Sequence, residues 1–166
     1  MEKIREKRIN EELNNLERAK ITKKLPQNIF YQLIEKDGVL DDYKILVSFK
    51  GRQETIWQNY EIKGILSFPA DFPIEPPSFQ FIENFQHIHV YSNGVICLPL
   101  ITKDFWNTKT TVLNVIIQIE DLIHRPPNLA SPANHLLSEL YQNSIEQYEN
   151  FIRNMYKDDN FPQENF

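Results

Sequence analysis

The chain has 166 residues and the composition of a globular protein, with 41% hydrophobic, 25% charged and 12% aromatic residues. This length allows one domain with a core of its own, which needs no disulfide or metal to hold it together. The net charge of −5 argues against nucleic acid as the main partner, and a single cysteine excludes an intrachain disulfide.

The beginning of the chain is charged, and no apolar run approaches the ~20 residues that cross a bilayer. We therefore expect neither a signal peptide nor a transmembrane segment. A lone cysteine suits a reducing compartment, so we expect an intracellular protein of the cytoplasm or nucleus.

Residues 2–20 are predicted to form a helix, because apolar residues recur among the charges at roughly helical spacing. These residues are Ile4, Ile9, Leu13 and Leu16. Residues 1–24 carry eight Lys or Arg and five Asp or Glu, so this end is basic while the rest of the chain is acidic. The helix is either a surface for an acidic protein partner or an ordinary solvated amphipathic helix.

Four segments rich in β-branched or aromatic residues are predicted as strands: Ile29–Glu35, Tyr43–Lys50, Tyr60–Phe68 and Ser78–Glu83. Their short connections favour an antiparallel meander. Between the third and fourth strands, four prolines exclude helix and central strand, and they predict a rigid, extended surface loop: Pro69, Pro73, Pro76 and Pro77.

The stretch from Ile82 to Asn107 has little periodicity, and long irregular segments inside a domain are often functional. Three helices are predicted after it. The first spans Thr110–Ile123 and has a wide apolar stripe. The second begins with Ser131 as N-cap and Pro132 at its first position, with Leu136, Leu137, Leu140 and Tyr141 on its face. The third carries Ile145, Tyr148, Phe151, Ile152 and Met155.

This order of elements predicts one α+β domain over residues 1–157 and a polar tail over 158–166. Within the irregular segment, Cys97 has three interpretations. It is a small buried hydrophobe among apolar neighbours, a metal ligand with His87 and His89, or a nucleophile. A structural zinc site requires four ligands, and only three candidates lie here. Thioester exchange by a nucleophilic cysteine requires mainly an exposed, well-positioned thiol.

Several spaced motifs occur in register along the chain. Phe68–Pro77 reads Phe-Pro-x-x-Phe-Pro-x-x-Pro-Pro, and His87 precedes Cys97 by ten residues, with an Asn93-Gly94 turn and the triplet Ile96-Cys97-Leu98. Trp106, Pro127-Asn128 and Pro132-Ala133-Asn134 follow. In these motifs and in its order of elements the chain resembles the ubiquitin-conjugating enzymes, over about residues 5–156.

The resemblance implies a UBC-like fold with an N-terminal helix, a four-stranded antiparallel meander, an irregular active-site segment and three C-terminal helices. It also implies that Cys97 accepts ubiquitin or a ubiquitin-like protein as a thioester from an activating enzyme and passes it to a substrate amine. The carrier needs no metal or organic cofactor, because the activating enzyme uses the ATP. The N-terminal helix would bind the activating enzyme, and the proline-rich loop would bind a ligase.

The resemblance assigns three groups of site residues. Catalytic roles fall to Cys97, His89 and His87. The groove for modifier and substrate would include Asn93, Asp104, His124 and Arg125. The ligase-facing surface would include Ile74, Glu75, Trp106 and Asn107.

The departures from the family pattern lie near Cys97. His89 stands where the family has Asn, and Ile88 replaces a proline. His124 and Arg125 stand where an acidic or small polar residue is usual, and His124 is a candidate base. The alternative is therefore a non-catalytic member that serves as a binding or structural subunit of a larger complex, in whatever compartment that complex occupies. The first helix is similar to the branch that modifies cullins, and the C-terminal half to the ubiquitin and SUMO branches.

Overall fold

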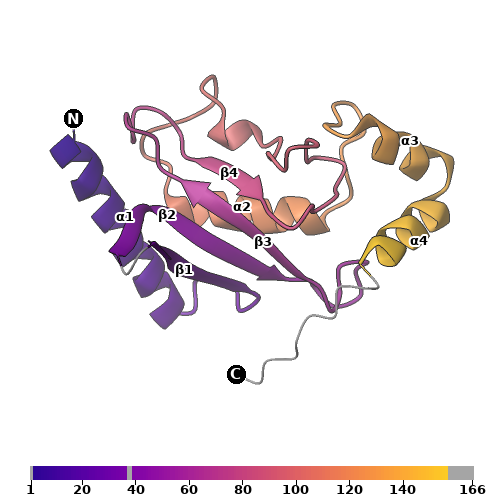
Figure 1. The fold of residues 1–166 in the computed structure, drawn as a ribbon, viewed down its shortest axis with the longest axis horizontal. Coiled ribbons are helices and arrows are strands. Elements are labelled where there is room, and N and C mark those ends of the chain that lie inside the picture. The colour runs from indigo at the N-terminus through magenta and orange to yellow at the C-terminus, as the bar shows by residue number, and fades with distance from the viewer. Residues whose placement is uncertain (1, 37–38, 157–166) are drawn as a thin grey trace.

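The computed structural model describes residues 2–36 and 39–156, and its elements follow the predicted order (Figure 1). Helix α1 lies beside one end of a four-stranded sheet, α2 runs behind the sheet, and α3 and α4 lie at the opposite end (Figure 1). The elements are α1 Glu2–Ile21, β1 Ile29–Lys36, β2 Val39–Lys50, β3 Glu61–Ser67, β4 Ser78–Phe81, the 3₁₀ helix η1 Pro99–Ile101, α2 Val112–His124, α3 His135–Asn143 and α4 Ile145–Met155. The predicted α+β class and UBC-like fold are confirmed. The predicted tail over 158–166 lies outside the described residues.

The sheet is the predicted antiparallel meander, with strand order β1-β2-β3-β4. Alternate side chains of β2, namely Ile45, Val47 and Phe49, are fully buried, as the two-residue period of a strand with one covered face requires. Strand β4 ends at Phe81 rather than at the predicted Glu83. Glu83 has a φ of 59°, which lies outside the extended region and turns the chain away from the sheet.

The apolar face of α2 lies in the centre of the core. Its buried residues are 0–1% exposed and belong to one cluster with the inner face of the sheet: Val112, Val115, Ile116, Ile119, Leu122 and Ile123. Thr111 caps the helix, because its side chain accepts a hydrogen bond from the backbone N–H of Asn114. Ile96 and Leu98, on either side of Cys97, belong to the same cluster, so the Cys97 segment is anchored in this core.

Helix α1 is fastened to the start of α2 through a buried ion pair that the sequence did not reveal. Glu12 is 3% exposed, and its Oε2 accepts a hydrogen bond of 2.8 Å from the backbone N–H of Val112. Arg8 pairs with Glu12 at 2.7 Å and donates to the carbonyls of Thr108 and Thr110. By contrast Ile4, which was predicted on the apolar face, is 60% exposed.

Helix α3 begins at His135, so the predicted start at Ser131 and Pro132 is wrong. The backbone N–H groups of Ala133 and Asn134 both donate to the carbonyl of Ile88 at 2.9 Å, which holds this stretch in a non-helical conformation. Asn134 is the actual N-cap.

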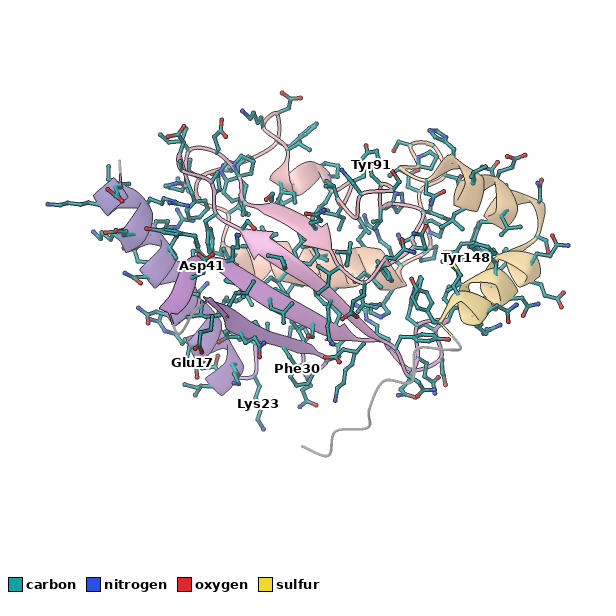
Figure 2. The ribbon with its side chains drawn as sticks, in the orientation of Figure 1. Glu17, Lys23, Phe30, Asp41, Tyr91 and Tyr148 are labelled. Carbon is teal, nitrogen blue, oxygen red and sulfur yellow. The ribbon has the colours of Figure 1, made fainter. Side chains whose placement is uncertain are left out.

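The exposure of α3 and α4 also differs from their predicted faces. Leu137 on α3 and Tyr148 and Ile152 on α4 are buried, whereas Leu136 is 80% exposed. Tyr148 faces the rest of the domain (Figure 2). Among the described residues, none of the helices is both long and apolar enough to span a membrane.

Candidate active site around Cys97

A tight turn brings Cys97 back alongside His89. Gly94 has a φ of +83°, and a Cβ there would lie 2.4 Å from the carbonyl oxygen of Phe81, so glycine is required. Asn93 supports the turn by accepting a hydrogen bond from the N–H of Val95. The chain beyond the turn pairs with the chain before it, and the N–H of Cys97 donates to the carbonyl of His89 at 2.8 Å. Cys97 is a free thiol and is partly exposed, so it is not the fully buried hydrophobe of the packing interpretation.

Tyr91 contacts Cys97, and the sequence analysis missed it. The phenol of Tyr91 hydrogen-bonds to the thiol, and this bond and the charge of the thiolate raise the pKa of Tyr91. Tyr91 is 47% exposed and lies among the loops between η1 and α3 (Figure 2). The sequence does hold a clue to this contact. An Asn-Gly turn places residue 89 opposite residue 97, and residue 91 then projects to the same side of the hairpin as residues 89 and 97.

His89 connects Cys97 to the segment that follows α2. Its side chain is almost fully buried, and Nε2 accepts a hydrogen bond of 3.0 Å from the backbone N–H of Asn128. Because a peptide N–H can only donate, this geometry assigns the ring proton to Nδ1 and makes the ring neutral. Burial, and secondly the charge of Arg125, lower the pKa of His89. His89 therefore holds the loop beyond α2 against the hairpin that carries Cys97.

His87 supports the backbone of the site. It is buried, Nδ1 accepts from the N–H of His89 at 3.0 Å, and the ring also hydrogen-bonds to the backbone of Ile123. Its ring stacks on Phe85 at an interplanar angle of 15°. Burial is the main cause that lowers the pKa of His87 to about 3, so the ring is uncharged at neutral pH. Both of its nitrogens are hydrogen-bonded, and the side chain supports the backbone on either side.

The buried His87 predicts a loss of stability in acid. The unfolded chain binds a proton on His87 below about pH 6.5, but the folded chain does so only near pH 3. Lowering the pH from 8 to 5 should therefore reduce the free energy of unfolding by ~2 kcal/mol through this group alone. Urea unfolding of the wild type and of His87→Gln at both pH values checks this. We expect the variant to be less stable at pH 8 but to lose less on acidification; an equal loss in both proteins would contradict the role.

The structure does not present His124 as a free base. Its side chain is 1% exposed, Nδ1 lies 2.8 Å from the carbonyl of Glu120, and Nε2 accepts from the N–H of Arg52 at 3.0 Å. Burial is the main cause that lowers its pKa. The buried Glu120 also pairs with Arg52 and accepts from Asn28. His124 thus joins the end of α2 to the connection between β2 and β3, and the interpretation of His124 as a base loses its geometric support.

The other predicted groove residues lie around the loops. Arg125 is half-exposed, lies 3.5 Å from Asp121 and acts electrostatically on His89. Asp104 is exposed in the loop after η1. Within residues 2–36 and 39–156, no group of three His, Cys, Asp or Glu side chains is arranged to hold a metal ion. The metal interpretation of Cys97 therefore has no support from the geometry.

Comparison with known protein families identifies the family of this chain. The family model described as ubiquitin-conjugating enzyme matches residues 8–156. The chain belongs to the ubiquitin-conjugating enzyme family. It is 32% identical to a probable ubiquitin-conjugating enzyme E2 of Acanthamoeba polyphaga mimivirus, over 67% of this chain and 70% of the relative. It is 30% identical to a SUMO-conjugating enzyme of Dictyostelium discoideum and 31% identical to a ubiquitin-conjugating enzyme E2 of Yarrowia lipolytica, each over 70% of this chain and 74% of the relative. The predicted resemblance is confirmed.

The predicted ligase-facing loops of this ubiquitin-conjugating family member are joined to each other. Lys103 lies 2.6 Å from Glu75, and the indole N–H of Trp106 donates to the carbonyl of Pro73 at 2.9 Å. Asn107 accepts from the N–H of Lys109 within its own loop.

The proline-rich loop is folded rather than extended, so that part of its prediction is wrong. Successive turns bury the ring of Phe72, which is 1% exposed and contacts Phe68 and Trp106. The same turns leave Ile74 64% exposed, and on the partner loop Phe105 is 70% exposed. Phe105 was missed because an isolated aromatic residue in an irregular segment has no periodicity.

Proposed function

We propose that this protein is an active conjugating enzyme, which carries ubiquitin or a ubiquitin-like modifier as a thioester on Cys97. The observation that supports this most directly is the partly exposed free thiol of Cys97, held by a backbone hydrogen bond to His89 and contacted by the Tyr91 hydroxyl. Family membership and the names of the ubiquitin and SUMO relatives support the same chemistry.

The proposed reaction has two balanced steps. In the first, the Cys97 thiolate attacks the thioester between the modifier and an activating enzyme; a new C–S bond forms, the old one breaks, and the departing thiolate takes up the proton. In the second, a substrate amine attacks the new thioester, an amide bond forms, the Cys97 thiolate leaves, and the proton lost by the amine neutralises it. Thioester exchange is nearly balanced in energy, so positioning by the hairpin can supply much of the catalysis.

The experiment separates charging from transfer. The protein is charged with ATP, a matched activating enzyme and ubiquitin or each ubiquitin-like modifier in turn, the activating enzyme is quenched, and free lysine is added. We expect a thiol-sensitive adduct with at least one modifier, and its decay on addition of lysine. A folded protein that forms no adduct with any cognate pair would refute the proposal.

A stable subunit role is the alternative. The cation of Arg125 beside His89 disfavours the approach of a charged ammonium, which supports a non-catalytic member. In that case α1 would bind a partner other than an activating enzyme. Failure to charge, together with retention in a complex, would favour this second function.

We propose two interaction surfaces for the active enzyme. The N-terminal segment 1–24 would contact an activating enzyme, because its eight Lys and Arg residues outnumber its five Glu residues and complement an acidic surface. The joined loops that expose Ile74 and Phe105 would contact a ligase, because exposed apolar side chains on a held backbone suit a partner's pocket. Residues 1–157 would act as one domain inside the cell, where ATP-dependent activation takes place.

The ligase surface predicts a selective defect. Ile74→Arg should lower ligase-stimulated discharge by about tenfold or more, since it places a charge where an apolar anchor is expected, and should leave discharge to free lysine unchanged. Discharge is measured with each ligase that stimulates the wild type. Ile145→Arg, at an exposed apolar position on α4, is the control. Equal ligase stimulation in the Ile74 variant and wild type would refute the assignment.

A further inference from the structure

One hydrogen bond near Cys97 depends on the protonation state of its acceptor. The backbone N–H of Asn128 donates to Nε2 of His89 at 3.0 Å, and His89 is 5% exposed. A protonated imidazole has no free lone pair, so it would oppose an N–H to an N–H in a buried place. The contact therefore exists only while His89 is neutral.

The attachment at the far end of this stretch, at Ala133 and Asn134, does not titrate. Ala133 and Asn134 are held by the carbonyl of Ile88, which accepts at any pH. Asn128 accepts from the N–H of Ala130 through its own side chain, which makes residues 128–130 a local turn. The Asn128 end of this segment is thus fastened through His89, and the Ala133 end through a backbone carbonyl.

We propose that His89 is an acid-sensitive positioning residue, which in its neutral form holds Asn128, within the segment 125–130, against the hairpin that carries Cys97, and on protonation releases it. The inference rests on the proposed function, because His89, which holds this segment, is hydrogen-bonded through its carbonyl to Cys97, whose thioester a substrate amine would attack. His89 acts through the segment and through the backbone carbonyl that receives the N–H of Cys97.

The groups that face His89 disfavour its protonated ring, and so favour release of the segment when the ring is protonated. From the segment after α2, Arg125 acts on it as a cation. From its own segment, the ring of His87 lies 5.7 Å away between centroids and is neutral down to about its pKa of 3. Cys97 and Tyr91 are its remaining titratable neighbours on the hairpin. Burial, and secondly the charge of Arg125, lower the pKa of His89, so both disfavour the protonated ring.

The direction of the pH dependence follows from these neighbours. Because the pKa of His89 is lowered from its ordinary value of 6.5, the neutral form and the hydrogen bond prevail at pH 7 and above. As the pH falls below 6.5, the unfolded or released state binds the proton more readily, and the attachment of Asn128 weakens. The effect should appear on the acid side only.

Amide hydrogen exchange by NMR tests the switch without any activity. Protection of the Asn128 amide, relative to a free peptide at the same pH, should fall about tenfold between pH 7.5 and the acid limb of the titration, while the Ala133 amide keeps its protection. His89→Gln places an oxygen near the position of Nε2 and cannot titrate, so its Asn128 protection should be high at both pH values. His89→Leu, which has no acceptor, should be low at both. Asn128 protection in the wild type that does not change through the titration of His89 would overturn the proposal.

A pH-jump experiment connects the switch to the reaction. Wild type and His89→Gln are charged at pH 7.5, transferred to lower pH and discharged by hydroxylamine. The ionisation of hydroxylamine affects both proteins equally, so the ratio of their rates isolates His89. We expect the ratio of wild type to variant to fall about tenfold in acid; a constant ratio would contradict the role. A chain that never charges would refute the proposed function, while the exchange measurement would still decide the inference about His89.

Discussion

Cys97→Ala should abolish the covalent adduct with the modifier, and Cys97→Ser should give either no adduct or one that resists thiols. Cys97 is the only cysteine of the chain, so no other side chain can form a thioester. A serine hydroxyl can form only an oxygen ester, which thiols do not cleave readily, and it is a far weaker nucleophile near neutral pH. The adduct is measured on denaturing gels with and without reductant.

Val95→Ala is the matched control for the Cys97 variants. Val95 lies two residues away on the same hairpin and is 37% exposed, so the substitution trims a more exposed side chain of that hairpin and leaves the thiol in place. We expect it to charge like the wild type. If Val95→Ala also lost the adduct, the defect would reflect the hairpin rather than the thiol; an adduct on Cys97→Ala would place the modifier elsewhere on the chain.

Glu12→Ala should lower the free energy of unfolding by about 3–5 kcal/mol, the largest effect we expect for a single residue outside the apolar core. The substitution leaves the N–H of Val112 without its acceptor and removes the partner of Arg8, both at the joint between α1 and α2. Glu12→Gln keeps an acceptor oxygen and should cost less. The midpoint and slope of urea unfolding measure both.

Glu11→Ala is the control for this prediction, because Glu11 is the exposed neighbour on the same helix. It should change the unfolding free energy by no more than about 0.5 kcal/mol. A Glu12→Ala protein within ~1 kcal/mol of the wild type would show that the buried pair contributes nothing net, as some buried ion pairs do.

The fold could be predicted where local pattern and packing agree. The alternation in β2 and the apolar stripe of α2 correspond to buried faces, so periodicity found these elements and the antiparallel order. The start of α3 could not be predicted, because it depends on a carbonyl at Ile88, far back in the chain. Glu12 was missed because a carboxylate on an amphipathic helix normally indicates a solvated face, and only the tertiary contact with Val112 shows otherwise.

The site was predictable in outline and not in its hydrogen bonds. Motif spacing singled out Cys97, His87 and His89 as candidates, and the Asn-Gly motif indicated the turn between them. Roles depend on which partner each ring nitrogen meets, and these partners lie far away in sequence: Asn128 for His89 and Arg52 for His124. Residue type alone therefore suggested a base at His124, whereas the geometry shows a buried side chain whose two ring nitrogens both contact the backbone.

Intact-mass spectrometry of the charged wild type tests the central claim most directly. The folded protein is incubated with ATP, activating enzyme and ubiquitin or SUMO, under conditions in which a control conjugating enzyme is charged, and is measured before and after treatment with a thiol. We predict a mass gain of one modifier less one water with at least one of the two, fully reversed by the thiol. An unchanged mass with both modifiers, from protein whose unfolding is cooperative, would contradict the claim that Cys97 carries ubiquitin or SUMO and would favour the structural subunit.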